Sequence, residues 1–234
     1  METRSREIQI TTKDGSMAAW LAVPDGAGPF PGVVVSMEAF GLNGHIKSVA
    51  DRIAREGYVA IAPDFYYRAD DRIAEYSDLP KAIGLMSALT DDGILDDVRA
   101  TIDTLKGRKE VRADRIGMTG FCMGGRMTFL TACNLPIQAA APFYGGGIGG
   151  LLDQAGGLSC PMVAFFGEKD GFIPLSEVEA VKGKLAELGK EAEVVLYDGA
   201  DHGFFCEERE SYDEAAAGDA WRKVLALFRD HLAK

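Results

Sequence analysis

The sequence predicts one α/β domain spanning residues 1–234, with a mostly parallel sheet, helices on both of its faces and an antiparallel ribbon at its N-terminus. The first observation behind this prediction is the alternation of apolar strands with amphipathic segments through the last two thirds of the chain, a pattern typical of parallel sheets with crossover helices. The second is the length, because 234 residues suit one domain with a full core. The third is the composition, 47% hydrophobic and 26% charged, which is that of an ordinary globular protein.

The N-terminal ribbon is predicted from two extended segments, residues 7–11 and 18–23. They lie on either side of Asp14-Gly15, a dipeptide that favours a hairpin turn. Residues 24–31 are rich in glycine and proline and are expected to form a loop.

The first buried strand is expected over residues 32–37, a continuous β-branched run typical of strands covered on both faces. A helix follows over about residues 45–56, and the next buried strand over residues 58–62. Residues 65–92 combine tyrosines, scattered charges and a proline. They indicate a surface excursion with a short helix near residues 81–89.

The remaining elements follow from the same periodicities. A stripe of apolar residues at helical spacing predicts a helix over residues 92–106. Further strands are expected at 116–121, 138–143, 162–166 and 192–197, and further helices at 123–134, 175–188 and 212–232.

The net charge and the cysteine positions indicate which binding partners and cofactors the protein is expected to lack. The net charge of −11 and the absence of a basic cluster argue against a nucleic acid or an anionic membrane. The charged N-terminus leads into no secretory signal, and no apolar run approaches a membrane span. The four cysteines fit neither a Cys-x-x-Cys metal pattern nor a disulfide framework. We therefore expect a cytoplasmic protein with reduced thiols and with no metal or organic cofactor.

The segment Gly120-Phe121-Cys122-Met123-Gly124 carries the strongest indication of chemistry. It joins a predicted strand directly to a predicted helix, as in the Gly-x-Ser-x-Gly nucleophile elbow of α/β-hydrolases, with cysteine in place of serine. A turn that sharp leaves no room for Cβ atoms beside the nucleophile, and a helix N-terminus favours a thiolate. The alternative is a small buried cysteine, which is the commoner role of this residue type.

Two further loops supply an acid and a base. Asp170 follows the predicted strand at 162–166, and His202 follows the strand at 192–197. Both therefore belong to the carboxyl edge of the sheet, where open α/β sheets place their ligands. Taken singly, Asp170-Gly171 is an ordinary turn signal and a lone histidine in a glycine-flanked loop is usually solvated. The chain order of nucleophile, acid and base is nevertheless that of an α/β-hydrolase, which predicts a Cys122–His202–Asp170 triad.

These motifs resemble the dienelactone hydrolase family over nearly the whole chain. The resemblance is carried by Gly-Phe-Cys-Met-Gly-Gly-Arg at 120–126, Phe-Tyr-Gly at 143–145, Gly-Glu-Lys-Asp at 167–170, Asp-His-Gly-Phe at 201–204 and Glu-Ala-Phe-Gly at 38–41. It implies hydrolysis of an ester or lactone through a thioester acyl-enzyme. It also implies that the resting thiol contacts Glu38 until substrate binding turns the sulfur toward histidine. The alternative for Glu38 is a solvated carboxylate at the sheet edge.

The expected oxyanion hole consists of the backbone N–H groups of Met123, which follows the nucleophile, and Ala39, which lies after the first buried strand. The family motifs make Phe40 and Tyr144 candidate substrate contacts. Family members acting on dienelactone are expected to hold its carboxylate with arginines, and the candidates for that role here are Arg209 and either Arg68 or Arg72. Two glutamates close to Arg209, at 207 and 208, depart from that pattern, so the resemblance transfers the reaction type and leaves the substrate open.

The predicted function is hydrolysis of a small-molecule ester or lactone by a monomer or small homo-oligomer. A broad carboxylesterase or thioesterase would use the same residues with a different acyl pocket. A non-enzymatic ligand-binding or redox-sensing protein is the alternative from another class, and the presence of Cys122, Asp170 and His202 argues against it.

Overall fold

The computed structural model describes residues 1–233, whose strands form one eight-stranded sheet. The strands are β1 (Thr3–Thr12), β2 (Gly15–Pro24), β3 (Phe30–Ser36), β4 (Val59–Pro63), β5 (Val111–Phe121), β6 (Ala139–Phe143), β7 (Met162–Gly167) and β8 (Ala192–Tyr197). The helices are α1 (Gly44–Arg55), α2 (Leu79–Ser87), α3 (Asp91–Lys106), α4 (Met123–Asn134), α5 (Leu175–Glu187) and α6 (Glu214–His231), with short 3-10 turns η1 (Ile148–Leu151) and η2 (Ala155–Gly157).

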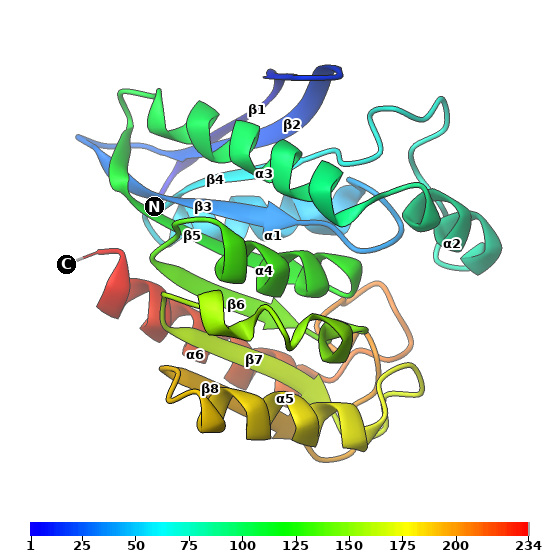
Figure 1. Ribbon diagram of the computed structural model, residues 1–234. Helices are drawn as coiled ribbons and strands as arrows, with labels where there is room; N and C mark the ends of the chain where they lie inside the picture. Colours follow the sequence, from blue (N-terminus) through cyan, green and yellow to red (C-terminus); the bar gives the residue numbers. More distant parts are fainter. Residues whose placement is uncertain (234) are drawn as a thin grey trace.

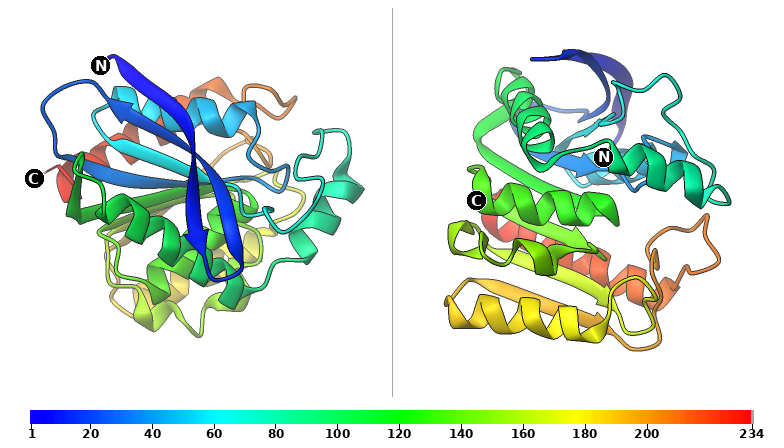
Figure 2. Two further views of the ribbon diagram at one scale, coloured as in Figure 1. Left: turned by 90° about the horizontal axis from the view of Figure 1, so that it is seen from above. Right: turned by 45° about the vertical axis from the view of Figure 1, so that its right-hand side comes forward.

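The sheet has the order β1-β2-β4-β3-β5-β6-β7-β8, and every pair from β4 onward is parallel. Only the N-terminal ribbon is antiparallel, both within itself and where β2 meets β4. Helices α3, α4 and α5 cover one face, and α1 and α6 cover the other (Figure 1). Figure 2 shows the same layers from two other sides and the long ribbon of β1 and β2 crossing the remaining strands. The predicted α/β architecture is therefore confirmed.

Two elements begin earlier than predicted. Strand β5 begins at Val111, five residues before the apolar run, because its charged first part pairs near Phe30 across a register shift. Helix α2 begins at Leu79 because Pro80 occupies the first turn, where its missing N–H costs nothing. The side chain of Asp78 caps this helix by accepting a hydrogen bond from Lys81 N at 3.1 Å.

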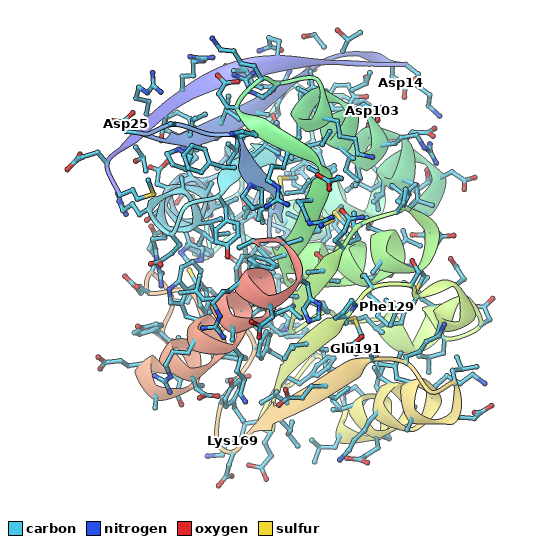
Figure 3. All side chains as sticks on the ribbon, turned by 90° about the vertical axis from the view of Figure 1, so that its left-hand side faces the viewer. Asp14, Asp25, Asp103, Phe129, Lys169 and Glu191 are labelled. Atoms are coloured by element: carbon cyan, nitrogen blue, oxygen red, sulfur yellow. The ribbon has the colours of Figure 1, made fainter. Side chains whose placement is uncertain are left out.

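The core fills both sides of the sheet. Phe129 of α4 has no exposed surface and lies in the interior, whereas Asp25 and Lys169 project from the periphery (Figure 3). In residues 1–233, no helix combines the length and the apolar character needed to cross a membrane. The parallel strands all place their carboxyl ends at one edge of the sheet, on the side where α2 projects (Figure 1).

Candidate active site

Four loops meet at this carboxyl edge, each immediately after a parallel strand. Glu38 and Ala39 follow β3, Cys122 follows β5, Asp170 follows β7 and His202 follows β8. The parallel strands end at the same edge of the sheet, so residues separated by up to about 160 positions are brought to one place. The structure thus brings together Cys122, His202 and Asp170 as the strand pattern predicted.

Cys122 occupies a strained turn between β5 and α4. Its backbone adopts φ 55° and ψ −117°, a conformation that non-glycine residues rarely adopt. A Cβ on Gly120 would lie 2.2 Å from the carbonyl oxygen of Gly124, and a Cβ on Gly124 would lie 2.4 Å from that of Ser36. The glycines therefore allow the close approach of backbone that holds the partly exposed sulfur at the N-terminus of α4.

Asp170 and His202 form a buried pair. The Oδ2 atom of Asp170 lies 2.8 Å from Nδ1 of His202, while Oδ1 accepts hydrogen bonds from the backbone N–H groups of Phe172 and Ile173 at 2.8 and 3.1 Å. Both residues are only 7% exposed. Because Asp170 engages Nδ1, the Nε2 atom is left to interact with the sulfur.

The charge state of His202 reflects these partners. Burial lowers its pKa, but the hydrogen bonds to Asp170 and Cys122, together with their negative charges, outweigh burial and raise the pKa to about 10. The imidazolium form of His202 is thus favoured by its contacts with Asp170 and Cys122.

Glu38 is completely buried next to this pair. Its Oε1 atom lies 3.5 Å from Nη1 of Arg209, and its Oε2 atom accepts a hydrogen bond from the Tyr76 hydroxyl at 3.4 Å. Burial raises the pKa of Glu38, against the opposing influence of Arg209 and His202. Among the described residues no hydrogen bond joins Glu38 to Cys122. In this conformation the sulfur of Cys122 interacts with His202 instead.

The backbone N–H groups of Met123 and Ala39 both border the site. Within residues 1–233 neither N–H has a hydrogen-bond acceptor, and both residues line the cavity that opens at Cys122. The Tyr66 hydroxyl donates to the carbonyl of Ala39 at 2.9 Å, which fixes the orientation of that loop. Two unpaired donors beside a nucleophile are the components of an oxyanion hole.

The cavity has a volume of about 660 Å³, within the range of small-molecule sites. Cys122 and His202 lie on its wall, and most of its other lining residues are apolar. The lining comes from the loop after β3, from α2 and the start of α3, from α4, and from the loops after β6, β7 and β8.

The chain was compared with protein families, with curated proteins and with solved structures. The family model described as the dienelactone hydrolase family matches residues 17–232. A Synechocystis protein named "Putative carboxymethylenebutenolidase" is 36% identical over 99% of both chains, and an Escherichia coli protein of the same name is 34% identical over 96% of this chain and 86% of its own. The crystal structure of a "Putative Dienelactone Hydrolase" from Klebsiella pneumoniae superposes with a TM-score of 0.93, at 36% identity and 99% and 100% coverage.

The chain belongs to the dienelactone hydrolase family. It is therefore a hydrolase, of the class that cleaves ester or lactone bonds. The resemblance inferred from the sequence motifs is confirmed.

Of the four substrate contacts predicted for this chain, two line the cavity and two do not. Phe40 and Arg209 line the cavity. Tyr144 does not line the cavity, because it is fully buried. Its ring packs edge-on against His202, with 5.2 Å between the ring centroids. Arg68 lies elsewhere, paired with Asp14 and Asp97.

Tyr144 and Arg68 thus lie outside the cavity lining, and residue type alone did not indicate that the Tyr144 ring packs against His202. Arg72, the alternative to Arg68, pairs with Asp64 at 3.3 Å and also lies outside the cavity lining.

Several cavity residues were missed by the sequence analysis. The surface excursion contributes Tyr76, Leu79, Ile83 and Met86. The apolar spacing of the last three along α2 was a usable signal, because they share one helical face. Phe172 also lines the cavity and packs its ring edge against His202 at 5.0 Å, but nothing in its sequence context marked it.

One buried group of residues has the chemistry of metal ligands. Glu38, His45 and Cys206 place one ligand atom each within 4.8 Å of the others. The guanidinium of Arg209 already sets a positive charge 3.5 Å from Glu38, and the Cys206 sulfur pairs with the Tyr76 hydroxyl at 3.2 Å. The expectation that the enzyme uses no metal stays a prediction.

Proposed function

We propose that this hydrolase cleaves its ester or lactone by nucleophilic catalysis, with Cys122 as nucleophile, His202 as base and acid, and Asp170 as the group that orients His202. The observation that carries the proposal is the relay of contacts from Asp170 Oδ2 to His202 Nδ1 at 2.8 Å and from His202 to the sulfur at the strained elbow. Nucleophile, base and orienting acid in this order are the components of a triad.

In the first step the Cys122 thiolate attacks the carbonyl carbon. A C–S bond forms and the carbonyl electron pair moves to oxygen. The C–O bond to the leaving group then breaks, and the His202 imidazolium gives its proton to the departing alkoxide. In the second step His202 takes a proton from water, the hydroxide attacks the thioester, and the thiolate leaves as the carboxylic acid product forms.

The tetrahedral intermediates carry a negative oxygen. The N–H groups of Met123 and Ala39 are the proposed donors to it, supported by their lack of other acceptors among residues 1–233. Removing one such donor typically costs about 3 kcal/mol of transition-state stabilisation. In an intact lactone the same attack opens the ring, and the alkoxide remains attached to the acyl group.

Glu38 is proposed to restrain the thiol before substrate binds. Its burial and its proximity to His202 support an electrostatic role. In the conformation described here its carboxylate is held by Arg209 and Tyr76 while the sulfur faces His202, which corresponds to the reactive arrangement of the proposed cycle.

The decisive experiment replaces the nucleophile. Cys122→Ala should lower kcat/KM for p-nitrophenyl acetate by several orders of magnitude, because the covalent step is lost. The melting temperature should stay nearly unchanged, since the partly exposed sulfur contributes little packing. Mass spectrometry of quenched wild-type enzyme should find the acyl group on the peptide containing Cys122, and acylation of any other residue would contradict the proposal.

A further inference from the structure

Helix α2 has an apolar face turned toward the catalytic cavity instead of the core. Leu79, Ile83 and Met86 line the cavity at i, i+4 and i+7, yet they are 40%, 46% and 36% exposed. Ala82 is the one residue of this helix that is buried. A contiguous apolar surface that remains open to solvent indicates a binding site, and this one leads to Cys122.

Other elements also contribute apolar side chains to the cavity lining. They are Ile94 of α3, Met123 and Met127 of α4, and Phe172, which is 63% exposed. Methionine side chains are flexible and adapt to varied apolar ligands. From Leu79 to Met86 the α2 face extends seven residues, about 10 Å at the helical rise.

The two arginines of the cavity each lie beside a carboxylate. Arg126 makes a bidentate pair with Asp91 at 2.6 and 3.0 Å, and this hydrogen bonding lowers the pKa of Asp91.

Arg209 lies 3.5 Å from the buried Glu38 and over the Phe40 ring at 5.6 Å. A substrate carboxylate placed on Arg209 would also lie close to the carboxylate of Glu38, and like charges at that separation repel.

We infer that the acyl group bound in this cavity is an uncharged, apolar chain of medium length that lies along the inner face of α2. The inference rests on the proposed function, because it assigns the substrate class of the same site. It predicts that the enzyme prefers esters with an alkyl acyl chain to esters whose acyl chain carries an ionised carboxylate.

The test compares acyl groups on a constant leaving group. We expect kcat/KM to rise from p-nitrophenyl acetate through the butyrate to the hexanoate, by roughly fourfold per added methylene until the cavity is filled. Mono-p-nitrophenyl adipate has the same six-carbon chain but ends in a carboxylate. It should be hydrolysed about tenfold more slowly than the hexanoate, or slower still, because its charge would be desolvated among apolar side chains and close to the carboxylates of Glu38 and Asp91.

The variant Ile83→Asn places a polar group on the cavity face of α2. It should lower the hexanoate-to-acetate ratio of kcat/KM by roughly fifteenfold, the loss of about two buried methylenes. The matched control is Leu196→Asn on β8, whose side chain is 40% exposed and outside the cavity lining. That control should keep the wild-type ratio, and the folding of both variants is checked by melting temperature.

The outcomes separate this inference from the proposed function. Adipate turnover equal to or faster than hexanoate turnover, or a ratio unaffected by Ile83→Asn, would overturn the apolar acyl site while Cys122-dependent acetate hydrolysis would leave the triad intact. Acetate hydrolysis that survives Cys122→Ala would instead overturn the triad. A rise with chain length that disappears in Ile83→Asn and persists in Leu196→Asn supports the inference.

Discussion

Replacing Asp170 by asparagine changes one atom of the proposed relay and tests its central contact. The Oδ1 atom can keep both backbone hydrogen bonds, from Phe172 N at 2.8 Å and Ile173 N at 3.1 Å. The new amide nitrogen then takes the place of Oδ2, 2.8 Å from Nδ1 of His202. Since an amide nitrogen only donates, Nδ1 must accept, and the ring proton of neutral His202 moves to Nε2, the atom that faces the sulfur.

The histidine can no longer take a proton from the thiol in that tautomer. General base catalysis contributes about 10²- to 10⁴-fold, so kcat/KM for p-nitrophenyl acetate should fall by that factor, or about 3 to 5 kcal/mol. The pKa of His202 should also fall, because a hydrogen bond and a negative charge that raise it are lost. The folded state should lose roughly 1 to 3 kcal/mol with the charge-assisted bond.

The control is Asp201→Asn in the same loop. Its Oδ1 atom accepts from the backbone N–H of His202 at 2.6 Å, and asparagine retains that acceptor. Activity is measured as initial rates over a pH range and stability by urea unfolding. Activity above about a tenth of wild type in Asp170→Asn, with Asp201→Asn unaffected, would refute the assignment of Asp170 as the orienting group.

Three further predictions follow from the same geometry. Glu38→Gln should shift alkylation of Cys122 by iodoacetamide toward lower pH, because removing a carboxylate beside a thiol favours the thiolate; a profile identical to wild type would leave Glu38 without influence on the thiol. Gly124→Ala should destabilise the fold by about 1 to 3 kcal/mol or more and displace the turn at Cys122, because the added Cβ would lie 2.4 Å from the Ser36 carbonyl oxygen. A wild-type melting temperature together with wild-type activity would contradict this prediction. Cys122→Ala should lower the pKa of His202 from about 10 toward 6.5 in an NMR titration, while buried His45 stays near its lowered pKa of about 4 as an internal reference; an unchanged His202 would show that the sulfur does not interact with it.

The positions of Cys122, Asp170 and His202 could be predicted from the sequence because each follows the end of a parallel strand. Apolar strands are recognisable by their composition, and parallel strands place their ends at one edge. The strained φ of Cys122 could be anticipated from the glycines at 120 and 124 for the same local reason. These residues depend on chain order and strand register, which the periodicity of the sequence encodes.

Which residues line the cavity is harder to predict from the sequence, because it depends on side-chain packing. Nothing local distinguishes Tyr144, which packs beneath His202, from a residue that faces substrate. Nor does the sequence show that Arg68 pairs with Asp97, 29 positions away, instead of entering the site. Such pairings are decided by side-chain packing between segments that are distant in sequence, so residue type alone does not predict them.

Helix α2 shows why reaction type and substrate class separate in this protein. The proposed catalytic groups lie just after strand ends, where a shift of one residue would move the sulfur out of reach of His202. The α2 residues Leu79, Ile83 and Met86 belong to an excursion outside the sheet, and substitutions there change the cavity without disturbing the strands (Figure 1). The proposed relay of Asp170, His202 and Cys122 could therefore operate on different acyl groups, and we infer that the apolar face of α2 selects the acyl group.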